Sequence, residues 1–202
     1  MNQIIKNTII LFVITLVAGI CLGTVHDITL DPIAQAQEAA ATKTYQEVYP
    51  DAASFDEPQE LADAVTAAAD SISEWGFGKV TINDAKEALD ASGNQIGYLI
   101  TSTSAESYGG NVQIAVGITN EGELTGIGFL SISDTPGLGM RAKEPDFKDQ
   151  FNGVQTDQFT LNKAGDSTSE TDINSVSGAS TSSGAIVNAV NAALDFYAAN
   201  VK

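Results

Sequence analysis

The pattern of apolar and charged residues near the start of the chain predicts a membrane-spanning helix. From Asn7 to Val25 no residue is charged, and apolar residues are nearly continuous. A helix needs roughly 20 apolar residues to cross the hydrocarbon core of a bilayer. Lys6 precedes this run, whereas Asp27 and Asp31 follow it. By the positive-inside rule, these charges predict a cytoplasmic N-terminus and an extracytoplasmic position for everything that follows the run.

Two alternatives to a retained anchor are a cleaved signal peptide and a lipoprotein signal. The triplet Ala34-Gln35-Ala36 has the small residues of a cleavage site, but it lies well beyond the end of the apolar run. A lipoprotein signal needs a small residue before Cys21, and Ile20 stands there. A retained anchor is therefore favoured, and a cleaved signal would leave the remaining chain in the same compartment.

After the anchor, the apolar residues recur at helical spacing. Residues 33–48 are rich in Ala, Gln and Glu and predict a helix that leaves the membrane, ended by Pro50. Residues 51–58 are polar and predict a turn region. A second, amphipathic helix is predicted over 59–75, with one apolar stripe whose last member, the tryptophan, is expected in the core. That stripe consists of Leu61, Val65, Ala68, Ile72 and Trp75.

From Lys79 the period changes to two, which is typical of strands. Strands are predicted from Val80, over 96–103, over 112–119 and over 124–133, and Gly122 is expected to need a positive φ in the turn before the last of them. The segment 134–139 breaks the sheet. A short helix over 146–151, a strand over 159–161, a polar loop over 163–172 and a C-terminal helix follow. The stripe of that helix is Ile186, Val190, Leu194, Tyr197 and Val201.

These elements predict an α+β fold in which one antiparallel sheet has flanking helices and is preceded by a single N-terminal transmembrane helix. The predicted organisation has four parts. They are a cytoplasmic N-terminus (1–6), a transmembrane helix (7–25), a helical connector (26–58) and an extracytoplasmic domain (59–202).

The composition limits the chemistry that this chain can perform. It has 26 acidic against 9 basic residues and a net charge of −17, so its surface repels the phosphates of nucleic acids and anionic lipids, and neither is expected as a partner. Cys21 is the only cysteine and His26 the only histidine. A disulfide within the chain, a cysteine-ligated iron–sulfur cluster, a zinc site and a Ser-His-Asp triad are therefore not expected. Any redox role requires an organic cofactor.

A hydroxyl-rich segment before the C-terminal helix is the candidate binding site. Residues 175–184 read Ser-Val-Ser-Gly-Ala-Ser-Thr-Ser-Ser-Gly. Helix capping accounts for one or two such hydroxyls, and a flexible serine-rich loop is another interpretation. Small residues at Gly178 and Ala179 allow a ligand to approach the backbone, and the N–H groups at a helix N-terminus suit a phosphate.

Two motifs resemble those of FMN-binding domains that a dedicated flavin transferase modifies. The segment from Ser177 to Ser183 is similar to the Ser-Gly-Ala-Thr-x-Thr/Ser-Ser motif, and Asp134-Thr135-Pro136-Gly137-Leu138-Gly139 is similar to the Glu-Thr-Pro-Gly-Leu-Gly loop that lies against the flavin. Tyr108-Gly109-Gly110, before a strand, also fits this family. The resemblance implies covalent FMN, joined by a phosphoester to Ser180, with Thr181 as the rival acceptor. The expected cofactor-binding residues are Thr135, Gly137, Leu138, Gly139, Ser177, Gly178, Ala179, Ser180, Thr181, Ser182 and Ser183.

The chain departs from the family pattern at two positions. Ser180 stands where the family usually has threonine, and either residue offers one hydroxyl. Asn174 stands where the family usually has aspartate, and Asp172 is the nearest carboxylate that could replace it.

The N-terminal region extends the resemblance to a membrane complex. The segments 15–19, 26–29 and 31–34 are similar to the G subunit of the Rnf complex and, more distantly, to the C subunit of the sodium-pumping NADH:quinone oxidoreductase. This implies an electron-relay subunit of an ion-translocating ferredoxin:NAD⁺ oxidoreductase. It would be a single-pass protein of the cell (inner) membrane, with other membrane subunits as partners and the ferredoxin and NAD sites on those subunits. A freestanding extracytoplasmic flavin reductase or electron shuttle, and a non-redox surface-anchored protein, are the alternatives. A hydrolase that uses Ser180 has no histidine base in the soluble part of the chain.

Overall fold

The computed structural model describes residues 2–69 and 75–201, which form two compact units, 1–42 and 43–202. Helix α1 (Gln3–Val48) makes up the first unit, and its last residues belong to the second. The helix is long and apolar enough to cross a membrane, and none of its most apolar window is buried. This confirms the predicted N-terminal apolar helix. The helix predicted over 33–48 is its continuation, and Pro32 lies within it.

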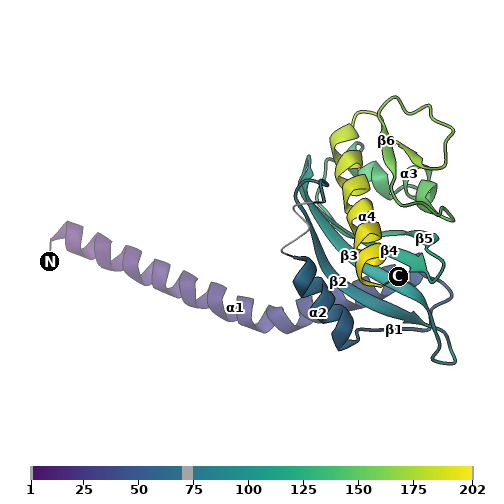
Figure 1. Ribbon diagram of the computed structural model, residues 1–202. Coiled ribbons are helices and arrows are strands. Elements are labelled where there is room, and N and C mark those ends of the chain that lie inside the picture. Colours follow the sequence, from purple (N-terminus) through teal and green to yellow (C-terminus); the bar gives the residue numbers. More distant parts are fainter. Residues whose placement is uncertain (1, 70–74, 202) are drawn as a thin grey trace. The chain divides into compact units, whose positions relative to one another are not determined.

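A five-stranded antiparallel sheet forms the centre of the second unit, and its strands follow one another in chain order (Figure 1). The four long strands are confirmed, but a clear alternation of burial occurs only at the start of β2, since β3 and β4 contain runs of consecutive buried residues. Gly122 has the expected positive φ of 88° in the turn between the last two strands. A first strand of three residues lies within the predicted turn region 51–58, so that prediction was wrong there. The strands are β1 (Ser54–Asp56), β2 (Val80–Leu89), β3 (Gln95–Ser107), β4 (Gly110–Thr119) and β5 (Leu124–Ile132).

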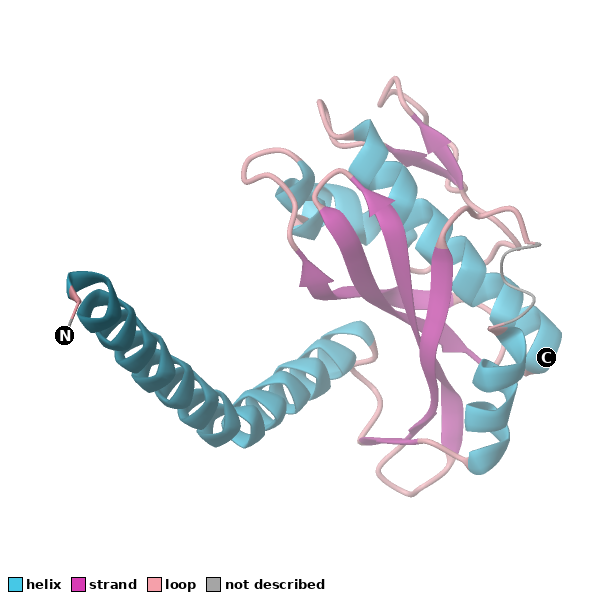
Figure 2. Cartoon of the chain, turned by 90° about the vertical axis from the view of Figure 1, so that its left-hand side faces the viewer, coloured by secondary structure: helices cyan, strands magenta, loops and turns pink. Residues whose placement is uncertain are grey.

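Helix α4 (Ser180–Asn200) lies along one face of this sheet, where the main core forms (Figure 2). Ile186 and Val190 of the helix and Ile100 and Ile114 of the sheet are all fully buried. The hydroxyl of Ser102 donates to the carbonyl of Ala189 at 2.8 Å. Because a buried hydroxyl without a partner is costly, this bond fixes the position of the helix along the strand as well as its distance from the sheet.

The opposite face of the sheet receives the end of helix α1. Gly117 and Gly128 leave the space that the side chain of Val48 fills. The carbonyl of Val48 accepts a hydrogen bond of 2.7 Å from Thr125 Oγ1, and Tyr49 Oη donates to the Ile96 carbonyl at 2.7 Å. The last turn of α1 is therefore an integral part of the second unit. The unit accordingly begins at Lys43, before the boundary at 59 that the sequence analysis predicts.

The remaining elements differ from the predictions mainly in extent. Helix α2 (Gln59–Ala68) ends earlier than the predicted 59–75, and part of that prediction lies outside the described residues. Trp75 packs against the core as expected. The predicted helix over 146–151 consists of α3 (Pro145–Lys148) and the 3-10 turn η3 (Asp149–Phe151), after a preceding 3-10 turn η2 (Gly139–Lys143).

A small second sheet was not predicted. Strand β6 (Thr160–Asn162) pairs in parallel with β7 (Asp172–Asn174). The predicted strand at 159–161 therefore exists, with a shift of one residue. The polar loop predicted over 163–172 ends at residue 171 in the structure, because Asp172 begins β7.

Candidate functional site

A tight turn leads into helix α4 and presents its N-terminus. The backbone N–H of Ala179 donates to the carbonyl of Val176 at 2.9 Å, and Gly178 has a φ of +77°. Only glycine adopts this conformation without strain at the third position of such a turn. Ser183 Oγ accepts a hydrogen bond of 3.0 Å from the Val176 N–H. The turn is thereby tied to the first turn of the helix, so the hydroxyls that follow Ala179 are held in fixed positions.

The loop after β5 is organised around the carboxylate of Asp134. Its Oδ2 accepts a hydrogen bond of 2.6 Å from Ser107 Oγ, and its Oδ1 accepts one of 2.8 Å from the Thr135 N–H. Gly139 lies directly against this carboxylate, since a Cβ there would be only 2.5 Å from Oδ2. Glycine at 139 therefore allows the loop to close around Asp134.

Asp134 is held in its ionised form. Burial by itself raises the pKa of the carboxyl group. The hydrogen bonds from the Ser107 hydroxyl and the Thr135 N–H, together with the nearby Ser182 hydroxyl and Gly109 N–H, outweigh this effect, and the pKa lies below its ordinary value. The Ser182 hydroxyl is close to the carboxylate but does not form a hydrogen bond of standard geometry.

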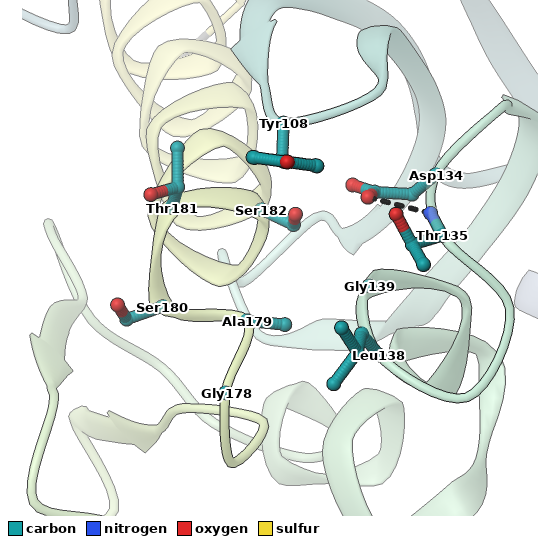
Figure 3. A pocket seen from close by; sticks show the side chains of 10 residues that line it. All are labelled: Tyr108, Asp134, Thr135, Leu138, Gly139, Gly178, Ala179, Ser180, Thr181 and Ser182. Carbon is teal, nitrogen blue, oxygen red and sulfur yellow. Dashed lines mark hydrogen bonds between the residues drawn. The ribbon is translucent and has the colours of Figure 1, made fainter.

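These two segments and the tip of the β3–β4 hairpin enclose a cavity of about 340 Å³ (Figure 3). That volume is in the range of cavities that hold small-molecule ligands, roughly 300–1,000 Å³. The close-up shows Tyr108 at the top and Leu138 below it, with Ser180 and Thr181 of α4 on the left and Asp134 on the right. The lining residues are Tyr108, Asp134, Thr135, Leu138, Gly139, Gly178, Ala179, Ser180, Thr181 and Ser182.

The structure thus brings together two motifs that are about forty residues apart in the chain. Eight of the eleven expected cofactor-binding residues line the cavity. The other three do not. Ser177 is exposed in the turn, Gly137 has a φ of +77° with open space around it, and Ser183 is buried in its bond to Val176.

Tyr108 and Asp134 line the cavity but were not among the expected site residues. Both belong to segments that the sequence analysis had connected with the family. Tyr108 is 78% exposed at the hairpin tip. The hairpin is held close to the next strand end, because a Cβ on Gly109 would be 2.6 Å from the Cα of Asp134. A local sequence pattern does not reveal this tertiary contact.

The cavity suits a phosphorylated aromatic ligand. The first turn of α4 offers backbone N–H groups that have no partner within the helix, together with the Ser180 and Thr181 hydroxyls. Leu138 and Ala179 supply an apolar surface for a ring. Within the described part of the chain, Ser182 Oγ is one of two buried side-chain atoms without a hydrogen-bond partner. Because such atoms are rarely left unpaired, this hydroxyl indicates that the site accommodates a polar group of a ligand.

Asn174, the second position that departs from the family pattern, belongs to a hydrogen-bond network outside the cavity. The backbone N–H of Asn174 donates to Gln150 Oε1 at 2.7 Å, and its Oδ1 accepts a bond of 2.9 Å from the Ser167 N–H. Asp172 Oδ2 accepts a bond of 2.8 Å from Ser167 Oγ. Asn174 and Asp172 therefore both order the loop between β6 and β7, and neither lines the cavity.

Comparison with known proteins agrees with this geometry. Residues 107–195 match the FMN-binding domain, and residues 1–48 match the RnfG N-terminal region. The G subunit of the Na⁺-translocating ferredoxin:NAD⁺ oxidoreductase complex of Acetobacterium woodii is 28% identical over 201 residues, which cover 96% of this chain and 91% of that protein. The G subunit of the ion-translocating oxidoreductase complex of Methanosarcina acetivorans is 28% identical over 199 residues, which cover 98% of this chain and 96% of that protein.

A solved structure is also similar to this chain, at lower identity. It is the C subunit of the Na⁺-translocating NADH-quinone reductase of Parabacteroides distasonis, with a TM-score of 0.47, 20% sequence identity and coverage of 56% of this chain and 60% of that chain.

The two matched regions coincide with the two parts of the structure that have distinct chemistry. The RnfG N-terminal region is the apolar helix α1, and the match to the FMN-binding domain includes every residue that lines the cavity. The chain is thus a membrane-anchored protein in which residues 107–195 are similar to the FMN-binding domain and residues 1–48 are similar to the RnfG N-terminal region.

Proposed function

We propose that this protein is the FMN-carrying G subunit of a membrane-bound, ion-translocating ferredoxin:NAD⁺ oxidoreductase. The observation that carries this proposal is the cavity at the N-terminus of α4, which combines phosphate-binding groups with an apolar surface for a ring. The names of the A. woodii and M. acetivorans relatives support the assignment to such a complex. Bound FMN supplies one- and two-electron exchange, and the other subunits of the complex are the electron donor and acceptor.

Different residues of the chain hold the phosphate and the ring of the cofactor. The backbone N–H groups of the first turn of α4 and the hydroxyls of Ser180 and Thr181 bind the phosphate. Leu138 and Ala179 contact the ring and displace water from its surface. The protein thus contributes position and electrostatics, while the redox chemistry belongs to the flavin.

The proposed attachment is a phosphoester on Ser180, formed by a flavin transferase. In this reaction the hydroxyl oxygen loses its proton and bonds to the FMN phosphorus of a flavin dinucleotide that the transferase supplies, while the pyrophosphate P–O bond breaks and the nucleoside monophosphate leaves. Ser180 and Thr181 both line the cavity, with Ser180 half-buried and Thr181 exposed. Ser180 is favoured because it occupies the acceptor position of the motif and its primary hydroxyl is less hindered.

The proposed location of the FMN-binding domain is the extracytoplasmic side of the membrane. Lys6 lies on one side of the apolar run, and Asp27 and Asp31 lie on the other. A covalent tether suits this side, because free FMN lost there would not be replaced from the cytoplasmic pool.

Flavin fluorescence of the denatured chain on a gel tests covalent attachment. The full-length protein is produced together with a flavin transferase, alongside the variants Ser180→Ala, Thr181→Ala and Ser177→Ala. We expect fluorescent bands for the wild type and for the last two variants, and none for Ser180→Ala. Fluorescence lost only in Thr181→Ala would move the attachment to Thr181. A dark wild-type band would refute covalent attachment.

Co-purification tests the assignment to a complex. A tagged chain extracted from its native membrane in mild detergent should carry other membrane redox subunits with it. A fluorescent chain that purifies alone would support the freestanding reductase or shuttle instead. A chain that neither binds flavin nor has redox partners would support a non-redox surface-anchored protein.

A further inference from the structure

Asp134 places a negative charge in the wall of the cavity without a cation beside it. The residue is only 7% exposed and lines the cavity. Ion pairs in the described part of the chain use Lys43, Lys86 and Arg141, and none of them involves Asp134. The donors that hold this carboxylate are neutral, so its charge is not cancelled by a partner. Any ligand in the cavity therefore experiences this charge.

The surrounding structure keeps this charge in one place. Ser107 Oγ and the Thr135 N–H donate to the two carboxylate oxygens at 2.6 Å and 2.8 Å, and Gly139 packs against the group from the loop. Neutral donors of this kind stabilise a carboxylate without cancelling its charge. The field of Asp134 within the cavity is therefore permanent near neutral pH.

The cavity consequently has a positive end and a negative end. The N-terminus of α4, at Ser180 and Thr181, carries the positive partial charge of the helix, whereas Asp134 is negative. Figure 3 shows Asp134 on the far side of the cavity from Ser180. A phosphate at the first end leaves the rest of the ligand within the cavity, of which Asp134 forms one wall.

We propose that Asp134 sets the reduction potential of the FMN in this cavity, by making the addition of electrons to the ring less favourable. This inference rests on the proposed function. The physical reason is that a fixed charge in a poorly screened site acts strongly on any charge that develops nearby. The negative charge favours the oxidised flavin and so lowers its midpoint potential, which makes the reduced flavin a stronger electron donor.

A redox titration of the flavin-loaded, full-length protein in detergent, followed by flavin absorbance, tests this proposal. Asp134→Asn keeps the shape of the side chain and removes the charge. We expect at least a tenfold change in the reduction equilibrium, which raises the midpoint potential by roughly 30 mV for a two-electron couple. Asp134→Glu keeps the charge and should remain close to the wild type.

The matched control is Glu144→Gln. It removes one negative charge from an exposed residue paired with Arg141, and we expect a less than twofold change in the same equilibrium. Asp134→Ser, a neutral residue of different shape, is the second test variant, and it should raise the potential as Asp134→Asn does. The proposal is overturned if neither neutral variant raises the potential beyond the control, or if both fold without taking up flavin, since Asp134 would then be a binding group. A wild-type chain without flavin would contradict the proposed function instead.

Discussion

The two glycines of the loop after β5 serve different purposes, and alanine substitutions should separate them. Gly137 has a φ of +77° and no atom near the position of a Cβ. Gly139 has no positive φ, but a Cβ there would lie 2.5 Å from Asp134 Oδ2. Gly137→Ala therefore strains only the backbone, whereas Gly139→Ala has to displace the carboxylate of Asp134.

The expected losses of stability follow from these contacts. A left-handed conformation of the alanine in Gly137→Ala costs about 1 kcal/mol. In Gly139→Ala, hydrogen bonds to a charged group are weakened, each of which contributes about 1.5–3 kcal/mol, and crowding adds to this loss. We therefore expect a decrease of about 3 kcal/mol in the free energy of unfolding for Gly139→Ala. For a domain of this size, about 1 kcal/mol corresponds to a shift of roughly 2–4 °C in Tm.

Thermal unfolding of the full-length protein in detergent, followed by circular dichroism, measures both variants. Gly139→Ala should lower Tm by roughly 6–12 °C and Gly137→Ala by roughly 2–4 °C, on the scaling given above. Flavin loading, measured by fluorescence of the denatured chain, should fall only in Gly139→Ala. If the two variants lose equal stability and load flavin equally, the close packing of Gly139 on Asp134 is not what the loop requires.

Three further predictions concern packing, the loop network and pH. Gly128→Ala places a Cβ 2.6 Å from Val48 Cγ2, and denaturant unfolding should show a loss of about 1–3 kcal/mol from this crowding. Asn174→Asp replaces the amide that donates to the Ser167 carbonyl at 3.0 Å. The same assay should show a loss of about 1–2 kcal/mol, and an unchanged free energy of unfolding would argue against the network. Because the pKa of Asp134 is lowered by folding, its contribution is present above its unfolded pKa of about 3.9 and is lost as the pH falls through the lower folded value. Asp134→Asn should therefore make the stability of the protein less sensitive to acid, and an unchanged acid profile would refute this.

The sequence pattern predicted the long elements of the fold well, because each extends over many residues between clear turn signals. Helix α4 and strands β3 and β4 each span ten or more residues. A three-residue strand contains a single alternation, and β1 and β7 also lie within polar segments, so the sequence predicted a turn and a loop there. Their pairing with β2 and β6 depends on contacts between segments that the local pattern does not describe.

The candidate site could be predicted in part for a similar reason. A helix start rich in small hydroxyl residues is a local feature, and the structure places Ser180 and Thr181 at the wall of the cavity. The participation of Tyr108 and Asp134 depends on how the β3–β4 hairpin meets the end of β5, which is a tertiary contact. Local sequence also did not distinguish Gly137 from Gly139, because a turn and a close approach both favour glycine.

The glycine-lined outer face of the sheet determines where the FMN-binding domain can be separated from its anchor. The side chain of Val48 fills the space left by Gly117 and Gly128 and packs with Leu99 and Ala115. A soluble fragment that begins after Tyr49 would expose this flat, apolar strip to water and invite aggregation. A fragment that begins before Lys43 retains the covering helix turn. Proteolytic release at the membrane surface would likewise yield a stable domain only if cleavage occurs on the N-terminal side of that turn.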